Sequence, residues 1–137
     1  EIGVRLVGSE MCIRDSYKAV NGQVNDLFYY YREQAALKAR QYQRALDDIV
    51  KAVELSPKDL TYRAEHAVVN LRVGRYEESM KILNEILKDE PKYGEAYRLL
   101  GLCQIQLKKT DEACGNFNKA KELGDPNVDE LIKKYCK

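Results

Sequence analysis

Few side chains in this 137-residue chain have the type and spacing that catalysis or metal binding requires. His66 is the only histidine, and no serine or cysteine stands beside it in the helix pattern to serve as a nucleophile. Asp47 and Asp48 are adjacent, so on a helix of roughly 3.6 residues per turn their carboxylates diverge by about 100 degrees. This favours solvated carboxylates over a metal pair. The glycines after residue 16 are isolated, which excludes a phosphate-binding loop. We therefore predict a chain that is not an enzyme and has no catalytic residue, metal ligand or cofactor-binding residue.

Of the four cysteines, the three that follow residue 16 are Cys103, Cys114 and Cys136, and their spacings match no zinc or redox motif. Cys103 is predicted four residues before the end of one helix, and Cys114 about three residues into the next. These positions lie at the same level of an antiparallel hairpin, so we expect the two to be in contact. Two interpretations stay open: buried free thiols that pack as small apolar side chains, or a disulfide, which would require an exported protein.

The first sixteen residues, EIGVRLVGSEMCIRDS, show neither helical nor strand periodicity. Residues 6–16 match one reading frame of the adapter that a transposase attaches to DNA before sequencing. We therefore exclude residues 1–16 from the fold as a non-native segment that we expect to be disordered. Residues 17–25 are interpreted as a linker or the remnant of an upstream region. The native N-terminus is then missing, and cytoplasmic and exported (periplasmic) locations both remain open.

Charge is nearly balanced, with 23 Lys and Arg against 22 Asp and Glu and a formal net charge of +1. Acidic and basic residues alternate along the chain. Nucleic-acid and membrane surfaces need clustered basic residues, so neither kind of binding is predicted. The apolar runs are far shorter than the roughly 20 residues of a membrane-spanning helix, which argues against membrane insertion.

The three prolines, Pro57, Pro91 and Pro126, are separated by 34 and 35 residues. At a period of 34, small residues recur where small residues stood and bulky ones where bulky ones stood. The columns are Tyr42, Tyr76 and Thr110; Ala45, Ser79 and Ala113; Ile49, Leu83 and Phe117; Ala52, Ile86 and Ala120; Ala35, Val69 and Cys103; and Ala39, Val73 and Leu107.

Each repeat contains two segments with apolar residues three and four apart, the mark of an amphipathic helix. Small residues let two antiparallel helices approach closely, and the bulky residue beside them fills the groove. The prolines are predicted in the first turns of helices, with Ser56 and an aspartate in LGDP as N-caps. The predicted helices are 28–40, 42–55, 60–73, 76–88, 93–107, 111–123 and 127–136.

This pattern resembles the tetratricopeptide repeat over residues 26–126, in three repeats of about 26–59, 60–93 and 94–126. Two departures stand in the first repeat, where Arg32 and Glu33 replace a preferred Leu and Gly, and two in the second, where Ser79 and Ile86 fill the small-residue columns. Pro126 lies one place late. The matching positions are Tyr97, Leu100, Gly101, Ala113, Phe117 and Ala120 in the third repeat, Tyr42, Ala45, Ile49, Ala52 and Pro57 in the first, and Ala67, Gly74, Tyr76, Leu83 and Pro91 in the second.

The resemblance implies an all-α array of three helical hairpins, a right-handed solenoid, closed by a capping helix within 127–137. One hairpin cannot cover its own apolar face, so successive hairpins must stack to form a core. The repeats are similar to those of bacterial members.

Members of this family bind other proteins, usually through an extended peptide in a concave groove lined by the first helix of each repeat. The implied function is a scaffold or adaptor for a protein or peptide partner. The lining is mostly apolar with three cations, which suits a peptide with apolar anchors and one or two carboxylates; the alternative is a set of ordinary helix faces without a ligand. The implied groove residues are Tyr30, Gln34, Leu37, Lys38, Ala64, Val68, Leu71, Arg72, Arg98, Leu102 and Ile105.

Some members grip the C-terminal carboxylate of a chaperone with Lys, Arg and Asn. The matching positions here include two carboxylates, which would repel such a ligand, so no chaperone-tail clamp is predicted. These positions are Tyr30, Gln34, Glu65, Glu95 and Leu99.

Consecutive aromatic residues, Phe28 to Tyr31, surround the start of the first repeat. They predict an exposed apolar patch that further upstream repeats, a partner or a second copy would cover. Two other functions stay open: an accessory regulatory or substrate-positioning tail of an upstream catalytic domain, and a self-associating structural array.

Overall fold

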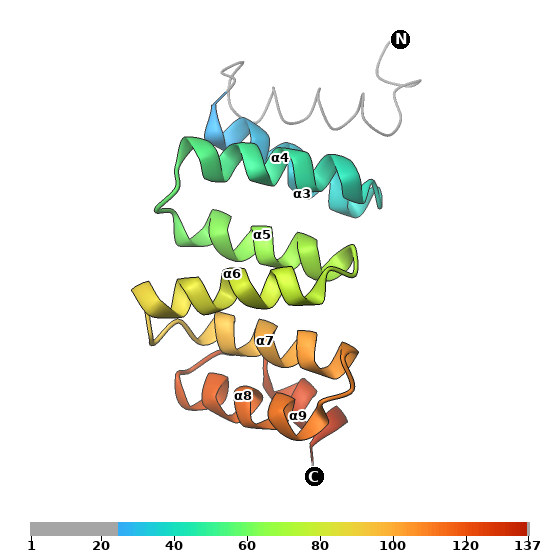
Figure 1. The fold of residues 1–137 in the computed structure, drawn as a ribbon, viewed down its shortest axis with the longest axis vertical. Helices are drawn as coiled ribbons and strands as arrows, with labels where there is room; N and C mark the ends of the chain where they lie inside the picture. The colour runs from blue at the N-terminus through green and yellow to red at the C-terminus, as the bar shows by residue number, and fades with distance from the viewer. Residues whose placement is uncertain (1–24, 137) are drawn as a thin grey trace. The chain divides into compact units, whose positions relative to one another are not determined.

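The computed structural model describes residues 25–136, and the predictions made for residues 1–24 and Lys137 lie outside this part of the chain. The described residues form helices and turns without a strand, which confirms the all-α prediction (Figure 1). The helices are α3 (Asp26–Lys38), α4 (Tyr42–Leu55), α5 (Leu60–Arg72), α6 (Tyr76–Asp89), α7 (Gly94–Gln106), α8 (Thr110–Glu122) and α9 (Asp129–Tyr135).

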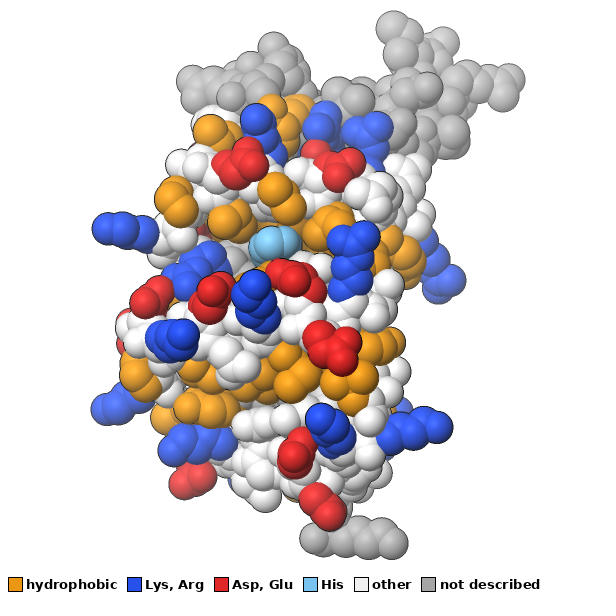
Figure 2. All heavy atoms as spheres, viewed as in Figure 1, with side chains coloured by type: hydrophobic (Ala, Val, Ile, Leu, Met, Phe, Trp, Pro, Cys, Tyr) orange, Lys and Arg blue, Asp and Glu red, His pale blue; other side chains and the backbone are white. Residues whose placement is uncertain are grey.

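The chain divides into two compact units between Val73 and Gly74. We call the described residues 25–73 the N-terminal unit and residues 74–136 the C-terminal unit, and describe each by itself. The surface visible in Figure 2 carries Lys and Arg side chains interspersed with Asp and Glu, in keeping with the balanced charge.

In the N-terminal unit, α3 and α4 form an antiparallel hairpin and α5 packs against α4. Ile49 is fully buried between two alanines one helical turn to either side, Ala45 and Ala52, which are also fully buried. Tyr62 and Val69 bring α5 into the same core cluster. The two small residues and the bulky residue between them on α4 therefore lie where the helices meet.

In the C-terminal unit, α6 packs on α7, and α7 forms a hairpin with α8 that carries α9. Gly101 lies directly against the Phe117 ring: a Cβ at this position would lie 2.6 Å from Cδ1 of Phe117. Ala113 and Ala120 flank the same ring and are fully buried. A missing side chain on one helix thus makes room for a large one on the other.

The helix ends differ from the predicted caps. Pro57, Pro91 and Pro126 lie in the turns before helices rather than in their first turns. Ser56 is the C-cap residue of α4, and its hydroxyl donates to Asp26 at 2.8 Å. Asp59 is the N-cap of α5 and accepts from the backbone N–H of Tyr62.

The LGDP segment also departs from its prediction. Gly124, at φ +88°, ends α8 as expected. Asp125 accepts from the N–H of Asn127 at 2.8 Å, but α9 begins only at Asp129, with Val128 as its N-cap residue. Asp125 therefore stabilises a turn, not a helix start.

The expected aromatic patch at the start of α3 is smaller than predicted. Phe28 is only 4% exposed, and the Arg32 guanidinium lies 5.1 Å from the centre of its ring. Leu27 and Tyr31 remain exposed. The prediction is therefore wrong for Phe28, which is buried, and holds for Tyr31; Tyr29 and Tyr30 are half-buried.

Candidate functional site

A pocket of about 470 Å³ opens between α3 and α5 in the N-terminal unit. The last turn and a half of α3 forms one wall, α5 forms the other, and the α3–α4 turn closes one end. Gln34, Leu37, Lys38, Arg40, Tyr42, Glu65, Val68 and Arg72 line this pocket, which we call the α3–α5 pocket.

Five lining residues belong to the groove set implied by the family resemblance: Gln34, Leu37, Lys38, Val68 and Arg72. The remaining three predicted residues of this unit do not line the pocket. Ala64 is 2% exposed and belongs to the core, and the ring of Tyr30 lies 5.3 Å from that of Tyr62. Leu71 is half-buried outside the pocket lining.

The rim of the pocket is cationic. Lys38, Arg40 and Arg72 are exposed, and none of them forms an ion pair with another residue of the described range 25–136. Arg32 behaves differently: it makes two hydrogen bonds to the Asp48 carboxylate, at 2.9 and 2.7 Å, behind the pocket. The three rim cations are therefore the charges that a ligand can neutralise.

Two lining residues, Gln34 and Glu65, are hydrogen-bonded to each other, and Gln34 also binds Glu33, which does not line the pocket. The Gln34 side-chain amide donates to Glu33 Oε1 at 2.8 Å and to Glu65 Oε2 at 2.9 Å. Glu33 is fully buried. Burial and the neighbouring Glu65 carboxyl raise the pKa of Glu33 to about 10, so Glu33 is protonated at neutral pH. Only Glu65 then contributes a negative charge to the α3–α5 pocket.

Sequence reasoning did not predict that Glu33 is buried, although a signal was present. At the 34-residue period Glu33 stands in the column of Ala67 and Gly101, which are both buried. A glutamate in a column of small buried residues has to enter the core and lose its charge.

The groove residues of the C-terminal unit have partners of their own. Arg98 donates to Asp125 at 2.8 Å and lies 3.8 Å from Glu95, beside a small pocket of about 180 Å³. Leu102 and Ile105 pack against the cluster around Phe117. In this unit the predicted residues already stabilise the turn before α9 and the core beneath it.

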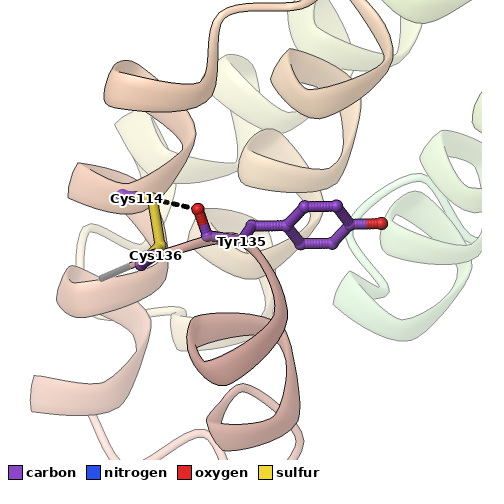
Figure 3. Close-up of a disulfide and its surroundings, with 3 residues drawn as sticks. All are labelled: Cys114, Tyr135 and Cys136. Carbon is purple, nitrogen blue, oxygen red and sulfur yellow. Dashed lines mark hydrogen bonds between the residues drawn. A yellow bond between two sulfur atoms is a disulfide. The ribbon is translucent and has the colours of Figure 1, made fainter.

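The cysteine pairing differs from the prediction. Cys114 forms a disulfide with Cys136 (Figure 3). Cys103 is a buried free thiol, so the alternative of a Cys103–Cys114 disulfide is wrong, and so is the free-thiol interpretation for Cys114. Cys103 faces the Ser79 side chain of α6, and burial raises the pKa of its thiol. Cys114 instead faces the end of α9.

Three further side chains, His66, Asp47 and Asp48, were candidates for catalysis or metal binding in the sequence. His66 is half-buried on α5, and its carbonyl oxygen accepts from the Asn70 amide at 3.0 Å. Asp47 is exposed, but Asp48 is 2% exposed and bound to Arg32, so the prediction that both are solvated is wrong for Asp48. Within residues 25–136 no three His, Cys, Asp or Glu side chains are grouped as a metal site would need, and no helix is long and apolar enough to cross a membrane.

Comparison with known proteins agrees with the repeat pattern read from the sequence. A family model described as "Tetratricopeptide repeat" matches residues 34–89 and 65–128. The chain is 29% identical over 99 residues to the small glutamine-rich tetratricopeptide repeat-containing protein 2 of Mycosarcoma maydis, covering 72% of this chain and 28% of that protein. It is 31% identical over 101 residues to the heat shock protein STI1 of Saccharomyces cerevisiae, covering 71% of this chain and 17% of that protein.

Among solved structures, the fold is similar to that of the first TPR of Spaghetti (RPAP3) bound to the HSP90 peptide SRMEEVD. The TM-score is 0.70 at 19% identity, over 81% of this chain and 90% of that one. The chain spans less than a third of the length of the two curated relatives.

Proposed function

Because the chain belongs to the tetratricopeptide repeat family and is a protein-interaction module, we propose that its α3–α5 pocket holds an extended segment of the partner protein. The observation that carries this proposal is the rim of three cations, Lys38, Arg40 and Arg72, that have no ion-pair partner in the described chain. Leu37 and Val68 are the apolar aliphatic residues of the same lining.

A ligand that suits this arrangement has acidic side chains next to an apolar one. Carboxylates pair with the rim cations, and the apolar side chain covers Leu37 and Val68 and leaves water. The protonated state of Glu33 matters here, because it leaves Glu65 as the single anion against three cations. The pocket therefore attracts an acidic segment despite the nearly neutral chain.

We further propose that recognition does not depend on a C-terminal carboxylate. Gln34 and Glu65 occupy two of the positions matched to chaperone-tail clamps, and their side chains are already hydrogen-bonded to each other. A terminal carboxylate placed there would meet the Glu65 carboxylate and be repelled.

Fluorescence anisotropy with labelled SRMEEVD tests both statements. The free acid and its C-terminal amide are titrated with the full chain, beside an amidated control peptide in which the acidic residues are replaced by their amides. We expect similar affinities for the first two peptides and at least tenfold weaker binding of the control. Lys38→Ala and Arg72→Ala should each weaken the acidic peptides about three- to tenfold, whereas Lys58→Ala, an exposed lysine outside the pocket, should leave them unchanged.

Equal binding by all of these variants would contradict the pocket as the site. A free acid that binds more than tenfold tighter than its amide would contradict the absence of a clamp but leave the pocket standing. The two proposals are thus separated by the choice of peptide.

A second candidate function rests on the length of the curated relatives. The chain matches only 28% of one relative and 17% of the other. We propose as the alternative that the repeats are an accessory module joined to an upstream catalytic domain whose substrate they position. Recovery of the native DNA upstream of the Tyr17 codon tests it: a frame that continues only into further hairpins would exclude a catalytic domain there. The same sequence would test the expected bacterial origin and the adapter interpretation of residues 1–16.

A further inference from the structure

Helix α9 is held to the C-terminal unit by partly buried apolar side chains and by exposed polar contacts. None of its seven residues is buried. The Lys121–Asp129 ion pair, at 3.5 Å, joins α8 to α9 through side chains that are both 63% exposed. The Glu130–Lys133 pair, at 4.0 Å, lies within α9 and does not connect it to the unit. Exposed pairs of this kind contribute little to stability.

The length of α9 adds to this weakness. Helices shorter than roughly 12 residues are marginal in water because the first turn is costly to form, so seven residues depend on their anchors. One anchor is Val128, fully buried just before the helix. The other is Cys136, just after it, bonded to Cys114 of α8 (Figure 3).

Helix α9 covers an apolar surface. Leu131, Ile132 and Tyr135 pack on the same cluster as Leu102 and Ile105, and the Tyr135 ring stacks on Phe117 with 6.4 Å between ring centres. The α7–α8 hairpin beneath has its own close packing, with Gly101 against Phe117. Loss of α9 would therefore uncover apolar side chains without removing the contacts that join α7 to α8.

We propose that the Cys114–Cys136 disulfide is a redox latch that holds α9 over this apolar surface and releases residues 129–136 when it is reduced. Two molecules of a small thiol supply two electrons and two protons: the sulfur–sulfur bond breaks, each cysteine Sγ gains a proton, and the reductant leaves as its own disulfide. Val128 keeps the released segment attached. Cys103 takes no part, because it is buried and burial disfavours its thiolate.

Hydrogen–deuterium exchange on the full chain tests the latch. A Cys12→Ser background removes the fourth cysteine, so that thiols can be counted, and the air-oxidised protein is compared with the same protein in dithiothreitol. We expect the amides of residues 129–136 to exchange at least tenfold faster after reduction, and those of α7 to change less than twofold. Cys136→Ser should resemble the reduced protein in both conditions, and Cys103→Ser should respond to reduction as the parent does.

Three results would overturn the proposal. Exchange in α9 that is unchanged by reduction would show that non-covalent contacts suffice to hold it. An equal rise throughout α7 and α8 would show a staple for the whole unit rather than a latch. Alkylation of three thiols in the air-oxidised, denatured protein would show that the bond does not form; alkylation of Cys103 alone supports it.

Discussion

Glu33 shows at the scale of one residue how an exchange within a repeat column changes the chemistry of its surroundings. The column holds Ala67 and Gly101 in the other repeats, and the glutamate is fully buried in the same position. Its side chain meets Gln34 and Glu65 and keeps its proton. A residue that reads as acidic in the sequence is therefore neutral in the folded chain.

The raised pKa of Glu33 predicts that stability falls as pH rises. Unfolding returns the pKa from about 10 to 4.5, so the unfolded chain binds fewer protons than the native one between these values. The stability that protonated Glu33 contributes to the free energy of unfolding is fully present below pH 4.5. It is lost progressively toward pH 10, by up to about 1.4 kcal/mol per pH unit. Glu33→Gln, which is always neutral, should remove this slope between pH 5 and pH 8.

Urea unfolding followed by circular dichroism at pH 5, 6.5 and 8 measures the effect, with the disulfide kept oxidised. Glu85→Gln, at an exposed position of α6, is the matched control and should keep the parent slope. A Glu33→Gln chain with the parent's pH dependence would show that Glu33 is ionised in the native state.

At the scale of elements, the turn inside each repeat uses one backbone geometry with three different residues. Arg40, Gly74 and Lys108 stand 34 residues apart, and their φ angles are 59°, 87° and 64°. After α3 and α7, the next residue's N–H donates to a carbonyl five residues back, from Gln41 to Ala36 and from Lys109 to Gln104, both at 2.8 Å. This is the helix-ending motif that favours glycine, because a side chain is strained at positive φ.

We therefore predict that Lys108→Gly stabilises the chain by about 0.5–1 kcal/mol, since it relieves the left-handed conformation at a solvent-exposed turn. Gly74→Ala should cost about 1 kcal/mol; no atom lies within 4 Å of the added Cβ, so the loss is one of backbone strain. Thermal and urea unfolding measure both changes.

Lys81→Gly, at an exposed position in the interior of α6, is the control. It should destabilise by about 0.5–1 kcal/mol, because glycine in a regular helix costs conformational entropy. If Lys108→Gly destabilised the chain as much as this control, positive-φ strain would not be the governing factor at the turn.

For the whole molecule, the nearly balanced charge means that attraction to an acidic partner is local to the α3–α5 pocket. The formal net charge is +1, so the chain as a whole provides little long-range steering. Binding of amidated SRMEEVD should weaken about three- to tenfold between 50 and 500 mM NaCl, because salt screens the exposed rim cations.

Anisotropy titrations at the two salt concentrations check this, with the Lys38→Ala, Arg40→Ala, Arg72→Ala triple variant beside the parent chain. The triple variant should lose most of the salt dependence together with the affinity. A parent affinity that is indifferent to salt would show that apolar contact with Leu37 and Val68, not charge, governs binding.

The sequence by itself determined the helices, their pairing into hairpins and the family. These follow from spacing along the chain: amphipathic periodicity, small residues such as Gly101 and Ala113 beside bulky ones such as Phe117, and a period of 34. A helix face is a local property, so its pattern can be read without knowing what packs against it. The groove positions implied by the resemblance stay a prediction.

Only the tertiary structure decided which side chains meet. Cys114 pairs with Cys136 and not with Cys103, Glu33 is buried, and Asp59 rather than Ser56 begins α5. Each outcome depends on how far a helix is rotated toward its neighbour and on where a turn ends, to within one residue. Adjacent residues on a helix point about 100 degrees apart, so the rotation of a helix about its axis decides which of two neighbouring side chains enters the core. The sequence pattern does not define that rotation closely enough to say which side chains meet.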